Sequence, residues 1–441
     1  MPFNIKKKYK EIKDKIKKFF KKYWKQSLIF GLILFFLLLF SFGLAMFFKS
    51  KDSQNYPYTE FLGEIYDKIK DNYWEKISDQ QLSELFELGI EKLVNAPQTL
   101  EEQNKEGVKK KVLEIIKKSD QQKKKEFTVY LSSLVLANLK PFGRSSLYTM
   151  KDEANLKNLV QNIDSNVNLY QSLGIDKDSS PEEIAKAYEN KASQIKKEES
   201  PEANQKIQEL ERAYETLSAP ESKETYDQYG IEATVIGKLV KPTVAYIQIK
   251  KISPTTFDEL YKVTENIKDK EGLSSLILDL RGNIGGSIDI LPYLLGPFIG
   301  QGQYAYEFFH QGDYAPYKTM TGWFPGLVKY KKVVILIDEN TQSSAEVMAA
   351  VFKKYNVGIL VGTKTKGWGT IEKVFEISRQ IDPEEKYSMF LVHTLTLSDD
   401  NQPIEGKGVE PVINIKDPDW KNQLFAYFNY KQLVDAVEEL F

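Results

Sequence analysis

The chain of 441 residues contains no cysteine and only two histidines, His310 and His393. The lack of cysteine excludes disulfides, thiol nucleophiles and zinc–thiolate sites. With two histidines and no HExxH pattern, we expect no metal site and no other cofactor. A Ser-His-Asp triad would have to use one of those two histidines. The formal net charge is −1, and we expect no nucleic-acid partner.

Positive charge is concentrated at the start of the chain. The first 25 residues carry eleven lysines against Glu11 and Asp14, a local charge of about +9. Apolar residues recur there at spacings of three and four, which predicts a basic amphipathic cytoplasmic segment over residues 1–26, suited to an anionic membrane surface. A solvated lysine-rich leader without a specific role is the alternative.

Residues 27–48 contain no charged side chain, and sixteen of them are Leu, Ile or Phe. A helix of about 20 apolar residues crosses a bilayer, and buried core helices are seldom apolar on all sides. The segment lacks the small residues of a signal-peptide cleavage site. We therefore predict an uncleaved transmembrane helix and a single-pass plasma-membrane protein. Because the lysines precede the span, the N-terminus should be cytoplasmic and the C-terminal domains extracytoplasmic.

Three further units are expected after the span. Apolar periodicity predicts a helical N-terminal domain over residues 57–165 and a separate all-α unit over residues 166–230. In residues 236–441, short apolar strands alternate with helical patterns. This alternation favours an α/β core with a mainly parallel sheet, crossover helices and a C-terminal helix. The expected core strands are 244–249, 276–280, 333–338 and 357–362.

Two polar segments follow strands of this core, where the ligand crevices of α/β sheets lie. In the first, the backbone N–H groups of Gly285 and Gly286 could hold a developing oxyanion. A tight turn without a ligand is the alternative for this segment. The second begins at Ser343, three residues before Glu346, which is the spacing of a helix capping box. A capping serine can also be a nucleophile, with the Ser344 N–H as a second oxyanion donor.

These segments resemble the C-terminal-processing, or tail-specific, serine peptidase family. The resemblance covers residues 57–165 and 236–440, and it implies the family's α/β peptidase fold. It also implies hydrolysis of polypeptide near the C-terminus by a Ser/Lys pair, with Ser343 as the nucleophile and Gly285, Gly286 and Ser344 around the oxyanion. The matching motifs are Leu278-Asp279-Leu280-Arg281-Gly282-Asn283-x-Gly285-Gly286, the serines before Glu346, the turn 141–148, and Gly406-Lys407-Gly408-Val409-Glu410-Pro411.

Both departures from the family pattern affect the base. Trp368 stands where the family has its lysine, and Glu372 where it has the glutamine that orients that lysine. An indole N–H accepts no proton, and a serine hydroxyl is a weak nucleophile without a base. If residues 364–370 are extended, Lys366 shares a face with Trp368 and could substitute as the base. A solvated Lys366 without a role is the alternative.

Residues 166–230 resemble a J-domain, the cochaperone module that stimulates heat-shock ATPases. The matching stretches are 168–175, 180–188, 213–218 and 226–230. The His-Pro-Asp signature should fall at Lys196-Lys197-Glu198, where it is absent, so we expect no functional heat-shock chaperone partner. The unit lies where family peptidases usually carry a PDZ domain, and it could serve as a rigid spacer or bind a partner protein.

Three functions remain open from the sequence. The first is a membrane-anchored extracytoplasmic pseudopeptidase that binds polypeptide or scaffolds partner proteins, because Trp368 replaces the lysine. The second is an active serine-type endopeptidase that processes protein C-termini with Ser343 and a displaced base such as Lys366. The third is a membrane-linked cochaperone, which the missing His-Pro-Asp signature and the expected topology oppose.

Overall fold

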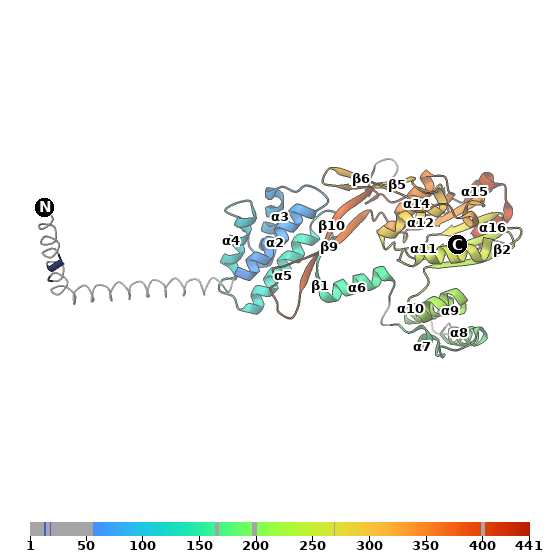
Figure 1. The fold of residues 1–441 in the computed structure, drawn as a ribbon, viewed down its shortest axis with the longest axis horizontal. Coiled ribbons are helices and arrows are strands. Elements are labelled where there is room, and N and C mark those ends of the chain that lie inside the picture. Colours follow the sequence, from blue (N-terminus) through green and yellow to red (C-terminus); the bar gives the residue numbers. More distant parts are fainter. Residues whose placement is uncertain are drawn as a thin grey trace, which may run out of the picture.

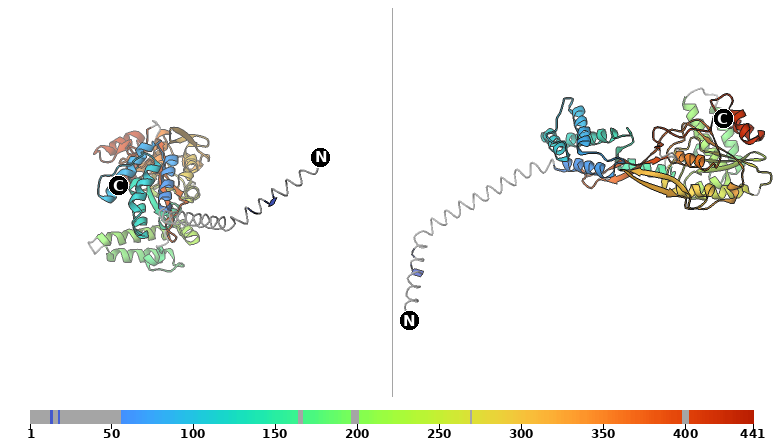
Figure 2. Two further views of the ribbon diagram at one scale, coloured as in Figure 1. Left: turned by 90° about the vertical axis from the view of Figure 1, so that its left-hand side faces the viewer. Right: turned by 90° about the horizontal axis from the view of Figure 1, so that it is seen from above.

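The structure is a computed structural model that describes residues 56–163, 167–195, 201–268, 270–397 and 402–441, together with Lys13, Asp14 and Lys18. A helical domain lies at one end and an α/β core at the other, with two long strands running between them (Figure 1). A second helical unit lies beside the core, and the view from above shows the same elongated arrangement (Figure 2).

The prediction of a transmembrane helix is contradicted in the part of the chain that the structure describes. No helix there is both long and apolar enough to cross a membrane. The longest, α9 (Pro201–Ser218), has 18 residues but carries charged side chains along its length. The predicted segments 1–26 and 27–48 lie outside the described residues, apart from the three residues named above. The fold class is therefore corrected to an α/β core with helical units, and the single-pass plasma-membrane location is withdrawn.

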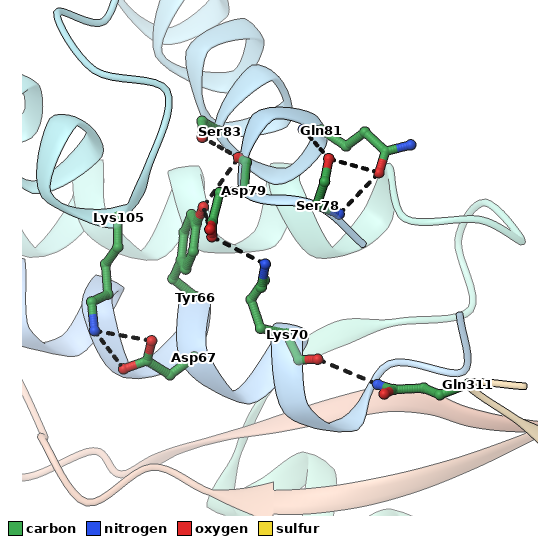
Figure 3. A network of polar contacts seen from close by, with 9 residues as sticks. All are labelled: Tyr66, Asp67, Lys70, Ser78, Asp79, Gln81, Ser83, Lys105 and Gln311. Atoms are coloured by element: carbon green, nitrogen blue, oxygen red, sulfur yellow. Dashed lines mark hydrogen bonds and ion pairs between the residues drawn. The ribbon is translucent and has the colours of Figure 1, made fainter. Parts of the chain in front are cut away.

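The helical domain consists of α2 (Tyr56–Asn72), α3 (Asp79–Val94), α4 (Lys105–Ile116) and α5 (Gln121–Ala137). Helix α3 begins with a capping box between Ser78 and Gln81, which satisfies two otherwise unpaired N–H groups. The Tyr66 hydroxyl of α2 donates to the Asp79 carboxylate at 2.9 Å, so the same turn also joins the two helices (Figure 3). The apolar faces of the helices bury large side chains, including Phe61, Ile65, Ile69, Leu82 and Phe86.

An antiparallel sheet connects this domain to the core. Its strand order is β1 (Ser146–Thr149), β10 (Tyr387–Leu397), β5 (Tyr304–His310) and β6 (Asp313–Lys318), and β9 (Thr370–Glu376) also pairs with β10. At the β5–β6 turn, the Gln311 side-chain amide donates to the Lys70 carbonyl at 3.3 Å (Figure 3). It also donates to the Tyr73 carbonyl at 3.0 Å. The sheet is therefore fixed to the end of α2.

The core contains a six-stranded sheet of order β11-β8-β7-β4-β3-β2, in which only the β2–β3 pair is antiparallel. Alternate residues of β3 face opposite sides: Ala245 and Ile247 pack with one apolar cluster, and Val244 and Tyr246 with another. Burial on both faces explains the continuous apolar runs of these strands. The strands are β2 (Val235–Lys241), β3 (Val244–Ile249), β4 (Ser275–Asp279), β7 (Lys332–Ile337), β8 (Ile359–Gly362) and β11 (Ile413–Asn414).

Helices cover both faces of this sheet. Helices α11 (Thr256–Lys268), α12 (Leu291–Ile299) and α14 (Ser344–Lys354) contribute to the first cluster. Helices α15 (Trp420–Phe428) and α16 (Lys431–Glu438) contribute to the second. The mainly parallel α/β core expected from the sequence is thus present. Shorter elements are η1 (Ile288–Ile290) and α13 (Pro325–Val328).

The J-like unit contains α7 (Leu169–Leu173), α8 (Pro181–Ile195), α9 and α10 (Pro220–Tyr229), and α6 (Met150–Gln161) precedes it in the chain. The expected signature position, 196–198, lies outside the described residues. Two ion pairs hold α9 near the core: Glu215 binds Lys250, and Arg212 binds Glu232. The unit is therefore in contact with the segment that follows β3. Its small core consists of Leu169, Leu173, Ile184, Leu210, Ala213 and Leu217.

Candidate functional site

Ser343 lies in the tight connection between β7 and α14, directly before the first residue of the helix. Its φ of 57° and ψ of −131° fall in a region that non-glycine residues rarely adopt. Such strain persists only where the surroundings impose it, and it concentrates at functional sites. The Ser343 N–H donates to the Glu346 carboxylate at 2.9 Å, which is one half of the capping box that the sequence suggested. A simple cap requires no such backbone, because N-cap residues normally have extended φ and ψ.

The Glu346 carboxylate holds this connection in place through hydrogen bonds. It is completely buried and accepts four hydrogen bonds, from the Ser343, Gly367 and Trp368 N–H groups at 2.9, 2.7 and 2.7 Å and from the Thr365 hydroxyl. Burial raises the pKa of Glu346, and these four donors oppose that rise. A single carboxylate thus joins the Ser343 turn to the loop that carries Trp368.

The glycine segment lies directly against Ser343. A Cβ atom added at Gly285 would come within 2.8 Å of Ser343 Cβ, so the contact depends on the absence of a side chain. The Gly285 N–H donates to the Asn283 side-chain oxygen at 2.8 Å and is therefore not available to an oxyanion. In the described part of the chain, the N–H groups of Gly286 and Ser344 donate no hydrogen bond. Beside Ser343, the N–H groups of Gly286 and Ser344 are thus free of hydrogen bonds, and Gly285 makes the close backbone contact.

The position expected for the lysine base is filled by the Trp368 indole. Its Nε1–H donates to Glu372 Oε1 at 3.2 Å, and the Thr370 hydroxyl donates to the same oxygen at 2.6 Å. Burial raises the pKa of Glu372, while the two hydrogen bonds and the charge of Arg144 lower it. The Trp368 and Glu372 side chains are therefore hydrogen-bonded to each other, and neither makes a hydrogen bond to the Ser343 hydroxyl.

The Arg144 side chain stacks on one face of the Trp368 ring, a contact that sequence reasoning missed. The Arg144 Cζ atom lies 3.5 Å from the Trp368 ring centroid, a cation–π arrangement. The guanidinium also forms an ion pair with Glu405 at 3.1 Å, and Glu405 accepts the Gly369 N–H at 2.8 Å. Arg144 precedes β1 in the chain. The base position is thus closed by a residue from outside the α/β core.

The proposed substitute base does not lie at this site. Lys366 is exposed, and it does not line the cavity next to Ser343. An extended strand over 364–370 would place Lys366 and Trp368 on one face, but β9 begins only at Thr370. The residues before it form a loop bonded to Glu346 and Thr341. Lys366 therefore does not share a strand face with Trp368.

A cavity of about 380 Å³ opens next to Ser343. Its walls are mainly apolar, and one wall comes from α6. Lys251 also lines it, a second residue that sequence reasoning missed because a lysine after a strand carries no distinctive signal. Burial lowers the pKa of Lys251, and Arg212 adds to this effect while Glu232 opposes it. The apolar lining residues are Leu156, Leu159, Val160, Ile284, Ile288, Ile371 and Phe390; Ser343, Trp368, Glu372 and Asp289 also border the cavity.

Two family models match this chain. Residues 243–415 match peptidase family S41, and residues 168–227 match the DnaJ domain. The chain is 28% identical over 191 residues to "Carboxy-terminal processing protease CtpA" of Bacillus subtilis (strain 168), covering 42% of this chain and 38% of that protein. It is 28% identical over 182 residues to "Probable CtpA-like serine protease" of Staphylococcus epidermidis (strain ATCC 35984), covering 41% of this chain and 35% of that protein. The matches therefore span less than half the length of these relatives.

Two solved structures also resemble parts of the chain. A photosystem II D1 C-terminal processing protease is 20% identical, with a TM-score of 0.33, and the match covers 39% of this chain and 42% of that one. A lipoprotein from Streptococcus agalactiae is 17% identical, with a TM-score of 0.35, over 63% of this chain and 95% of that one.

Proposed function

Because residues 243–415 form a peptidase family S41 domain, we propose that the chain is a pseudopeptidase that binds extended polypeptide in the Ser343 cavity. The observation that carries this proposal is the Trp368 indole at the base position, bonded to Glu372 and stacked on Arg144. An indole accepts no proton, so Ser343 lacks the partner that would activate it. The apolar cavity walls beside two free N–H groups suit a peptide ligand.

A second candidate function is serine-type cleavage of protein C-termini. The strained backbone of Ser343 and the free N–H groups of Gly286 and Ser344 favour it, because an inert cap needs neither. In the described residues, however, no side-chain base forms a hydrogen bond with the Ser343 hydroxyl. We therefore place this function second.

The J-like unit is proposed to act as a spacer that holds the α6 wall and the segment after β3 in position. Its ion pairs through Glu215 and Arg212 support this role. Binding of a partner protein by the unit would be an additional role. In that case the full chain should still bind the partner protein when a peptide occupies the Ser343 cavity.

We expect the full chain to bind peptides but not to hydrolyse them. Unfolded polypeptide and short peptides should bind equally well to the wild type and to Ser343→Ala, because the hydroxyl contributes little to ground-state binding. Turnover should be indistinguishable between the two proteins in a mass-spectrometric cleavage assay. A fluorophosphonate, which reports an activated serine, should label the wild type no faster than Ser343→Ala.

The same assay separates the two candidates. Cleavage or labelling that disappears in Ser343→Ala would overturn the pseudopeptidase proposal and support the peptidase. Lys366→Met serves as the matched control, because this lysine is exposed and outside the cavity. Loss of cleavage in that variant would instead reinstate Lys366 as a base.

A further inference from the structure

Lys251 is a lysine without a partner in a cavity that is mostly apolar. Among the described residues, its ammonium forms no hydrogen bond and no ion pair. The neighbouring charges are already engaged: Lys250 pairs with Glu215, and Glu232 accepts two hydrogen bonds of 2.9 Å from Arg212 Nε. Lys251 is half-buried beside Ser343 and the α6 wall. Its charge is thus partly removed from water, and only the more distant charge of Glu232 opposes this effect.

An unpaired, partly buried ammonium is unfavourable, and an anion that enters the cavity would restore the lost interaction. The lowered pKa of Lys251 reflects the same burial. Two carboxylates border the cavity, and neither pairs with this lysine. Glu372 is bonded to Trp368 and Thr370, and Asp289 is exposed to solvent.

Other features of the cavity also favour a negative charge. The N–H groups of Gly286 and Ser344 donate no hydrogen bond within the described residues. Ser344 is the first residue of α14, an eleven-residue helix whose N-terminus carries partial positive charge. Lys251 lies next to Ile252, which exchanges backbone hydrogen bonds with Gly285 and Ser287. Lys251 and Gly286 are therefore on adjoining segments, and the Ser344 hydroxyl donates to the Gly286 carbonyl at 3.4 Å.

We propose that Lys251 binds the terminal carboxylate of a polypeptide whose last side chain packs against the α6 wall. The proposal rests on the polypeptide-binding function and specifies its ligand as an apolar C-terminus. A C-terminal residue carries an apolar side chain and a carboxylate on the same Cα atom. An aspartate or glutamate inside a peptide carries its negative charge on the side chain instead. Such a residue has no apolar side chain to pack against Leu156 and Leu159 of the α6 wall.

Lys251 fits this role better than that of a proton acceptor. A general base must lie within hydrogen-bond reach of the hydroxyl that it deprotonates. The ammonium makes no hydrogen bond to Ser343. Lys251 is therefore assigned to ligand binding.

Fluorescence anisotropy with two labelled peptides tests the proposal on the full chain. The peptides share one sequence ending in leucine, one with a free carboxylate and the other with a C-terminal amide. The amide should bind the wild type about tenfold more weakly, a change of about 1.4 kcal/mol. Lys251→Met should bind the free acid about as weakly as the amide, with no further loss on amidation. Lys251→Arg should retain the preference for the acid, and the exposed control Lys366→Met should match the wild type.

The outcomes distinguish this inference from the function on which it rests. If the wild type binds neither peptide, both are overturned. If it binds acid and amide equally, polypeptide binding stands and the role of Lys251 is overturned. An equal loss for both peptides in Lys251→Met would indicate a structural role and overturn it as well. Ser343 labelling that disappears in Lys251→Met, with the acid preference intact, would identify Lys251 as a base instead of a carboxylate ligand.

Discussion

The double variant Trp368→Lys/Glu372→Gln should hydrolyse peptides that the wild type only binds. A positioned general base contributes about 10²–10⁴-fold, so we expect turnover to rise by about that factor. The Arg144 guanidinium lies 3.5 Å from the present indole centroid. A lysine placed there would have a lowered pKa because of this like charge, as a base requires. Mass-spectrometric cleavage of an unfolded protein substrate provides the measurement.

The second substitution is needed because of the charge on Glu372. In Trp368→Lys alone, the partly buried Glu372 carboxylate would pair with the new ammonium, raise its pKa and keep it protonated. The single variant should therefore remain much less active than the pair. Adding Ser343→Ala should abolish the gain. A folded double variant without Ser343-dependent cleavage would show that the loss of activity extends beyond the base.

Glu346→Ala should cause the largest loss of stability among single substitutions at the site. It leaves four donors without an acceptor where the glutamate side chain is now completely buried. We expect the free energy of unfolding to fall by about 3–5 kcal/mol, measured by urea denaturation. Glu346→Gln should recover part of this loss, because it keeps one acceptor oxygen and most of the volume.

An exposed glutamate provides the control for this prediction. Glu410 pairs with Lys364 at 3.0 Å, and its side chain is 59% exposed. Glu410→Ala should change the free energy of unfolding by less than about 1 kcal/mol, as for other surface pairs. Equal effects of the two substitutions would refute the anchoring role of the Glu346 carboxylate.

The parallel core could be predicted because its strands are buried on both faces and therefore appear as short apolar runs. The predicted strand 244–249 coincides with β3, and 333–338 differs from β7 by one residue at each end. The antiparallel sheet was not predicted. In it, Ser146 of β1 pairs with Phe390 of β10, far along the chain, and β10 is buried on both faces over most of its length. No local pattern signals a pairing of that range.

At the site, local motifs predicted which residues gather but not how each one acts. Gly285, Gly286, Ser343 and Ser344 come together because each follows a core strand. The Gly285 N–H donates to the Asn283 side chain, and this hydrogen bond depends on the Asn283 rotamer. The spacing of residues in a motif does not reveal a rotamer. Arg144 was missed because its contact with Trp368 joins distant parts of the chain, and Lys251 because a lysine after a strand carries no distinctive signal. Lys366 was misplaced because a loop, not a strand, precedes β9.

The stacking of Arg144 on Trp368 also limits how the chain can be divided. The peptidase-family match spans residues 243–415, but a fragment with those bounds would lack the Arg144 guanidinium, the α6 side chains and Glu215, the ion-pair partner of Lys250. Its tryptophan would face water on one side, and the cavity next to Ser343 would lose the wall that α6 provides. Negative results from such an excised piece would say little about the intact polypeptide.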